Sequence, residues 1–215
     1  LNPVSIRVTY ETQSASGDNF WVYGGDGSLR VSDAFELGGT FAQDENPLLK
    51  SRLAGVNATA KLGVGSLLFG EFAQTDQDGT TGSAFRIELR HQSEKFEGRV
   101  FAARSDSAFT NTSSTFYGGR TEFGGRFSTR LDDKTRLIGD ALHTENNTAR
   151  DGKRDGALIA IEREFNKAWR GEFGYRYAKE SGNYSPYPGA LTQINRGLVD
   201  NDVSAFSGKR RPGYE

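Results

Sequence analysis

Arginine and glutamate recur at every second position in several segments of this chain. Arg86, Glu88 and Arg90 form one such run, and residues 120–130 contain another. Side chains two residues apart in a β-strand lie on the same face, so each run predicts a row of charges along one side of a sheet. A row of this kind could line an aqueous pore, where its electric field would select solutes by charge.

The predicted polar face is rich in both signs of charge. We expect the following side chains to point into a lumen: Arg86, Glu88, Arg90, Glu97, Arg99, Arg120, Glu122, Arg126, Arg130, Arg136, Glu162, Glu164, Arg170, Glu172 and Arg176. An alternative interpretation is that arginine and glutamate pair across neighbouring strands and hold the strand register in a wet interior. Because both signs are present, the rows do not predict strong selectivity for anions or for cations.

The opposite face of the same segments is apolar. The segment Gly119–Ala141 shows this most clearly, because its two arms alternate on either side of a short polar turn at Asp132–Lys134. Aromatic residues towards the strand ends could form the belts that mark a membrane interface: Tyr10, Trp21, Tyr23, Phe41, Trp169 and Tyr177. In a soluble β-sandwich these residues would form the core, but the charged opposite face favours a membrane location.

The alternating segments repeat along the chain as about eleven strands of about ten residues. Short turns are predicted near residues 32, 64, 94, 133 and 167. Longer polar loops are predicted between them, at residues 45–51, 76–82, 106–115 and 146–155. Short turns at one end and longer loops at the other are typical of outer-membrane barrels. We therefore predict an all-β fold, an antiparallel up-and-down transmembrane β-barrel, with a soluble antiparallel sandwich as the alternative.

The strand count indicates that these residues do not close the barrel. Residues 1–180 are predicted to supply strands and hairpins, and residues 181–215 a long extracellular loop or irregular segment that leads to further strands. Single-chain bacterial barrels have an even number of strands, and an open edge in hydrocarbon would leave backbone groups unsatisfied. We expect part of a barrel with about 12 or more strands, closed by later strands or by a partner.

Composition narrows the choice of function. The 215 residues carry a net charge of −1, so the chain has no basic surface suited to nucleic acid. The absence of cysteine excludes disulfides, thiolate metal sites and cysteine nucleophiles. No apolar run reaches the length of about 18 residues that a transmembrane helix needs. The chain begins at Leu1 without methionine, which predicts a piece of a longer protein.

We expect no catalytic, cofactor or metal site. His91 and His143 lack neighbouring ligands at metal-binding spacing. The acidic pairs Asp76/Asp78 and Asp132/Asp133 do not match a calcium-loop pattern and are predicted to be solvated turns. Serines are numerous, but no nucleophile-elbow sequence accompanies a His/Asp context, so an outer-membrane lipase or protease is the least favoured function.

Four segments resemble a known class of protein. They are LRVSDAFELGGTFAQDENP at 29–47, LAGVNATAKLG at 53–63, FGEFAQTD at 69–76 and ARSDSAFTNTSSTFYGGRTEFGG at 103–125. This pattern resembles the C-terminal barrels of large multidomain outer-membrane proteins of Gram-negative bacteria. The resemblance implies an outer-membrane location in the cell envelope and a surface-display or export role, and it identifies no substrate.

Two functions follow from these patterns. The first is a polar, Arg/Glu-lined channel or export conduit in the bacterial outer membrane. The alternative is a non-conducting membrane anchor or translocator for surface or periplasmic domains outside this segment. Under both hypotheses the partners are outer-membrane lipid and either other envelope proteins or additional strands of the same chain, with no nucleic acid.

Overall fold

The computed structural model describes residues 20–111, 118–147 and 152–182. The expected first strand, which contains Tyr10, lies outside these residues. So does the expected outer loop at 181–215, except for residues 181–182, which belong to a strand. Within them the chain forms β1 (Val22–Ser32), β2 (Phe35–Asp44), β3 (Ser51–Gly63), β4 (Ser66–Gln77), β5 (Thr80–Gln92), β6 (Phe96–Ser105), β7 (Arg120–Arg130), β8 (Thr135–Asn146), β9 (Gly152–Glu164) and β10 (Arg170–Gly182).

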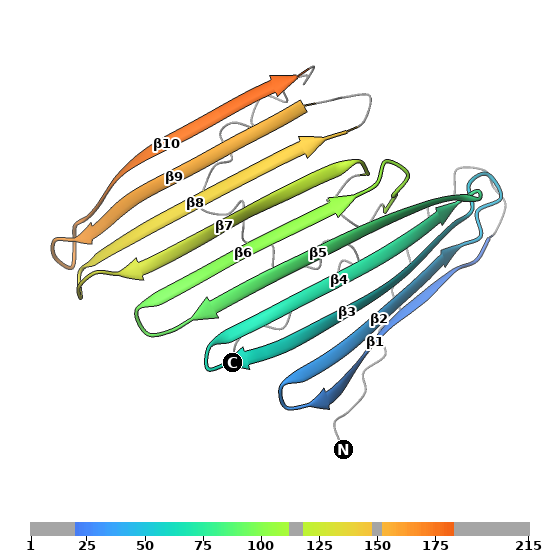
Figure 1. The fold of residues 1–215 in the computed structure, drawn as a ribbon, viewed down its shortest axis with the longest axis horizontal. Coiled ribbons are helices and arrows are strands. Elements are labelled where there is room, and N and C mark those ends of the chain that lie inside the picture. The colour runs from blue at the N-terminus through green and yellow to red at the C-terminus, as the bar shows by residue number, and fades with distance from the viewer. Residues whose placement is uncertain (1–19, 112–117, 148–151, 183–215) are drawn as a thin grey trace.

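The ten strands form one antiparallel sheet in chain order, from β1 at one edge to β10 at the other (Figure 1). Each strand pairs with the next, which confirms the predicted all-β, up-and-down arrangement. The two edge strands do not pair with each other, so the sheet is open. Within the described ranges, no helix has the length and apolar character needed to cross a membrane.

All five predicted short turns are confirmed, and they lie at the same end of the sheet. They join β1 to β2, β3 to β4, β5 to β6, β7 to β8 and β9 to β10. The turn between β3 and β4 requires glycine at Gly65, where φ is +73° and a Cβ would lie 1.9 Å from the carbonyl oxygen of Gln92. Position 65 therefore holds β4 and β5 in register at this end.

Two predicted loops are wrong, because the strands continue through them. β4 and β5 are joined by a two-residue turn at Asp78–Gly79, with φ of 49° and 79°, in place of the loop at 76–82. β9 begins at Gly152 and its first residues pair with the end of β8, so the loop predicted at 146–155 is shorter. Both errors arise because these strand ends are polar, and a stretch of polar residues predicts a loop.

The turn between β7 and β8 contains a titratable contact. The backbone N–H of Lys134 donates a 2.8 Å hydrogen bond to Oδ1 of Asp132, and this bond is the main reason that the pKa of Asp132 lies below its ordinary value of 3.8. A lowered pKa in the folded state means that the contact stabilises the turn fully above pH 3.8 and is lost as pH falls through the lowered pKa.

We expect Asp132→Asn to flatten the acid limb of the stability profile, because asparagine still accepts the hydrogen bond from Lys134 and does not titrate. Melting temperatures between pH 2 and pH 6, followed by the heat-induced shift in gel mobility, would measure this. Asp133→Asn is the matched control in the same turn. An equally steep acid limb in Asp132→Asn would contradict the assignment.

Burial in this sheet is the reverse of that in a water-soluble protein. The face that carries Arg86 and Glu88, here called the polar face, contains the most buried side chains, and these two are 5% and 1% exposed. The opposite, apolar face exposes its large side chains, including Phe72, Phe85 and Phe173, the last at 87%. The pairing registers place every exposed large hydrophobic residue within the strands on the apolar face.

Candidate functional site

The polar face gathers charged side chains from β5 to β10. The pairing registers place all of the charged residues predicted to face a lumen on this one face, from Arg86 on β5 to Arg176 on β10. Their position on a single face follows from the period-two alternation. Their role in a lumen stays a prediction, because the sheet is open.

The centre of the polar face is a cluster of three arginines around one glutamate. The side chain of Glu88 is fully buried; Oε2 accepts from Nη2 of Arg86 at 2.9 Å, and Oε1 accepts from Nε of Arg90 at 2.6 Å. Nε of Arg99, on β6, lies 3.2 Å from the same Oε1. We call these four residues the Glu88 cluster. Glu71 lies directly opposite Arg86 on the same face, so a second buried carboxylate adjoins the cluster.

An aromatic ring holds two of these arginines in place. The guanidinium carbon of Arg86 lies 4.2 Å from the centre of the Phe101 ring, and that of Arg99 lies 5.9 Å from it. Phe101 is buried and lies directly opposite Glu88 in the β5–β6 register. A cation above a ring face is attracted by the ring quadrupole, and more strongly where water is excluded. Phe101 therefore adds a geometric constraint that charge pairing alone would not give.

Other predicted members of the polar face pair locally. Nη2 of Arg120 lies 2.6 Å from Oε2 of Glu122 on the same strand, and Nη1 of Arg170 lies 3.7 Å from Oε1 of Glu162 across β9 and β10. The structure does not bring the remaining outer members into ion pairs among the described residues: Glu97, Arg130, Arg136, Glu164 and Arg176.

On β4–β10, the sequence prediction missed four charged residues of this face. Arg154 of β9 lies directly opposite Glu180 of β10, and their side chains form an ion pair of 2.5 Å. Glu71 and Asp140 are buried on the same face. Arg154 was missed because residues 146–155 were predicted to form a loop. Glu71, Asp140 and Glu180 could have been found from the alternation of polar and apolar residues.

Residues 106–111, which follow β6, turn inwards over the polar face. Phe109 is 1% exposed and packs against three alanines of neighbouring strands, Ala73, Ala84 and Ala103, with Leu53 at the margin. We call Ala73, Ala84, Ala103 and Leu53 the Phe109 socket. No sequence pattern predicted this contact, because the alanines come from three strands and only the register brings them together.

Hydrogen bonds fix the loop segment above its socket. The carboxylate of Asp106 accepts from the backbone N–H of Ser83 at 2.6 Å and from its hydroxyl at 2.9 Å. The backbone N–H of Thr110 donates to Oγ1 of Thr75 at 3.1 Å. Gly82 makes the approach possible, because a Cβ there would lie 2.1 Å from the backbone nitrogen of Phe109. The segment 106–111 therefore covers the polar face of β4–β6 at the loop end.

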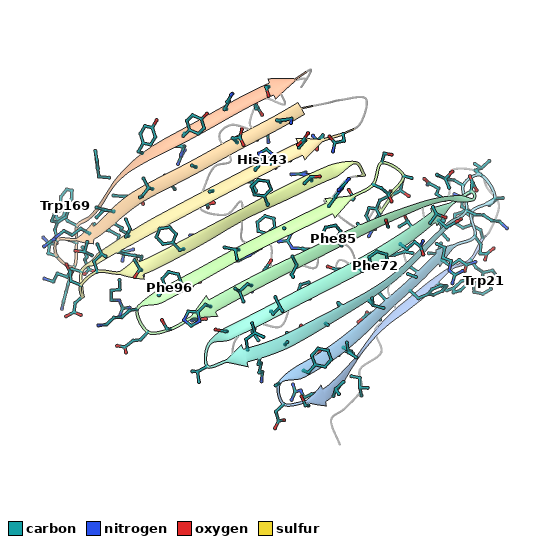
Figure 2. The ribbon with its side chains drawn as sticks, viewed as in Figure 1. Trp21, Phe72, Phe85, Phe96, His143 and Trp169 are labelled. Carbon is teal, nitrogen blue, oxygen red and sulfur yellow. The ribbon has the colours of Figure 1, made fainter. Side chains whose placement is uncertain are left out.

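The aromatic residues proposed for membrane belts lie in different places. Figure 2 shows Trp21 and Trp169 at opposite ends of the sheet, with Phe72, Phe85, Phe96 and His143 between them. The rings of Tyr23 and Phe41 lie 6.3 Å apart on β1 and β2. Tyr177 lies five residues before the end of β10, and its place in a membrane belt stays a prediction.

The histidines and acidic pairs hold local structure. Asp76 accepts from the backbone of Gly79 at 3.2 Å and from the Thr81 hydroxyl at 3.1 Å, which closes the β4–β5 turn. Nδ1 of His91 lies 2.8 Å from Oγ of Ser66, but among the described residues no carboxylate bonds to the ring to orient it as a base. No group of three or more potential metal ligands occurs within the described ranges.

Comparisons with known proteins find similarity in structure alone. No family model and no curated protein sequence matches the chain. The sheet is similar to OpdQ of Pseudomonas aeruginosa (TM-score 0.46, 13% identity, covering 86% of this chain and 57% of that one). It is also similar to OccAB2 of Acinetobacter baumannii (0.44, 10%, 77% and 51%) and to KdgM porin (0.34, 10%, 74% and 86%).

All three neighbours are outer-membrane β-barrel porins. The chain spans little more than half the length of OpdQ and of OccAB2. Likeness at this level concerns the succession of antiparallel strands, and it does not extend to function.

Proposed function

We propose that this chain forms part of a bacterial outer-membrane β-barrel that conducts polar solutes. The observation that carries this proposal is the reversed burial: the centre of the charged face is buried, at Arg86 and Glu88, and the large apolar side chains are exposed on the other face. In water, such an apolar face would be an aggregation surface, whereas in a bilayer it meets hydrocarbon. The open edges at β1 and β10 support completion by further strands, because unpaired backbone groups are costly in a membrane.

The proposed passage is lined by arginine and glutamate and is narrowed at the loop end. The Glu88 cluster supplies fixed charges at the middle of β5 and β6. The segment 106–111 covers part of the polar face above it. Solutes would therefore meet a constriction first and the arginine-rich wall next. Both signs of charge line this wall, so the proposal includes no strong preference for anions or for cations.

Planar-bilayer recording of the purified full chain tests conduction. We expect discrete conductance steps. Arg99→Gln removes one positive charge of the Glu88 cluster and should shift the reversal potential in a salt gradient towards cation preference. Lys50→Gln, a loop change outside the strands, is the matched control. A protein that inserts and shows no steps would refute conduction.

The alternative function is a non-conducting anchor or translocator for other envelope domains, as in the C-terminal barrels of large multidomain proteins. The seated Phe109 segment favours this alternative, because a loop fixed over the polar face could seal the passage. Conductance that appears only after the segment is released would support the sealed anchor.

A further inference from the structure

The apolar face of β6–β10 contains a trough with a floor of small side chains. The pairing registers align Val100, Gly125, Ala141, Ala157 and Tyr177 in one row across the five strands. Within this row, the three central strands, β7 to β9, contribute only glycine or alanine. The resulting groove has a volume of about 520 Å³.

Rings enclose the trough along its length. On the loop side, the ring of Phe123 stacks on His143 with centroids 4.6 Å apart. On the turn side, the ring of Phe127 lies over Gly139, where a Cβ would come within 2.1 Å of it. Tyr177 stands at the β10 end. Four strand spacings, about 19 Å, separate the end residues Val100 and Tyr177, and the glycine and alanine floor between them covers two spacings, about 10 Å. Part of a lipid acyl chain fits this length.

The loop-side rim of the trough is charged, although it lies on the apolar face. Nδ1 of His143 lies 2.6 Å from Oδ1 of Asp155, and Nζ of Lys153 lies 3.0 Å from Oε1 of Glu145. Lys179 lies opposite Asp155 on β10. Both carboxylates of the rim are therefore engaged by His143 and Lys153, and Lys179 adds a further cation.

Lys153 and Lys179 lie close enough to share one anion. They are diagonal neighbours on adjacent strands, a relation that separates residues by about 7–8 Å. Both side chains are exposed. Two ammonium groups at this spacing suit a phosphate. The trough begins one row from Lys179 and two rows from Lys153.

We propose that this trough and its rim bind one phosphate-bearing membrane lipid, with an acyl chain along Gly125–Ala141–Ala157 and the phosphate between Lys153 and Lys179. A second copy of the chain lying on the trough is the alternative that the experiment below distinguishes. The inference rests on the proposed membrane location and is independent of conduction.

Native mass spectrometry of the full chain in a non-ionic, phosphate-free detergent tests the proposal. Phosphatidylethanolamine, a galactolipid with the same acyl chains and inorganic phosphate are titrated separately. We expect one phosphatidylethanolamine per protein to be retained, at least about tenfold more tightly than the galactolipid or free phosphate. Equal retention of the galactolipid would refute the phosphate site, and equal binding of free phosphate would refute the acyl site. A dimer that excludes lipid would assign the trough to a second copy.

Two variants separate the trough from its rim. Ala141→Phe fills the floor and should lower retention about tenfold, whereas Ala58→Phe places the same ring on the apolar face of β3 and should not. Lys153→Gln with Lys179→Gln should lower phosphatidylethanolamine retention to the galactolipid level, and this pair does not alter the packing of the trough. Unchanged retention in either test overturns the proposal. Each variant's gel mobility before and after heating shows whether it is folded, and its conductance tests the channel separately.

Discussion

Glu88→Gln is expected to cost about 3 kcal/mol or more of the free energy of unfolding, because it leaves buried guanidinium groups without their carboxylate. Glu88 accepts from Arg86 and Arg90 and lies within 3.2 Å of Nε of Arg99. A neutral amide of the same shape keeps one acceptor and removes the compensating charge. Denaturant unfolding in detergent, monitored by tryptophan fluorescence and gel mobility, measures the loss.

The control for this change is Glu97→Gln, the same substitution on the same face of β6. Glu97 is exposed and belongs to no ion pair among the described residues. An exposed surface change of this kind is expected to stay within about 0.5 kcal/mol of the parent. Equal stability of Glu88→Gln and Glu97→Gln would show that the Glu88 cluster does not stabilise the sheet.

A second change should partly rescue the first. Removing one uncompensated cation with Arg90→Gln in the Glu88→Gln background is expected to recover about 1 kcal/mol, because contacting residues of one charge network couple by about 0.5–3 kcal/mol. Arg90 suits this test because its side chain is 20% exposed and leaves the smallest cavity of the three arginines. In the Glu88→Gln variant, the ion selectivity of conducting channels should also shift towards anions, since the polar face loses one negative charge.

The alternation of polar and apolar residues predicted the strands well. The two faces of the sheet have different surroundings, so every strand alternates in polarity with a period of two residues. Arg86, Glu88 and Arg90 were assigned to one face without any knowledge of their partners. The same alternation placed the short turns. The polar strand ends at Asp76 and Lys153 were missed, because these residues extend past the apolar band and no longer alternate in polarity.

The grouping of side chains across strands was beyond the sequence. Arg99 reaches Glu88 only because β6 pairs with β5 in one particular register, and a shift of one residue would place it on the other face. The Phe109 socket depends in the same way on alanines from three strands. Alanines at 73, 84 and 103 carry no chemical signal of their own. Contacts of this kind are fixed by pairing register, which a single sequence does not reveal.

Gly82→Ala is expected to release the segment 106–111 from the polar face. The added Cβ would lie 2.1 Å from the backbone nitrogen of Phe109 and 2.3 Å from the carbonyl carbon of Ala108. These are backbone atoms held by the hydrogen bonds of Asp106 and Thr110, so they cannot move aside without breaking those contacts. Loss of the Phe109 side chain from its socket removes about 1.5–3 kcal/mol of burial. A loss of this size corresponds to at least about a tenfold larger population of the released segment, so limited proteolysis of the segment should become at least about tenfold faster.

Gly70→Ala is the matched control, because a Cβ at that strand glycine meets nothing within 4 Å. Phe109→Ala provides an independent route to the same released state, since it empties the socket and leaves the backbone of β5 unchanged. If the segment narrows a conducting passage, Gly82→Ala and Phe109→Ala should both raise the single-channel conductance, and Gly70→Ala should not. Faster proteolysis with unchanged conductance would place the segment outside the passage. Conductance that appears only in the two released variants would instead identify the parent protein as a sealed anchor.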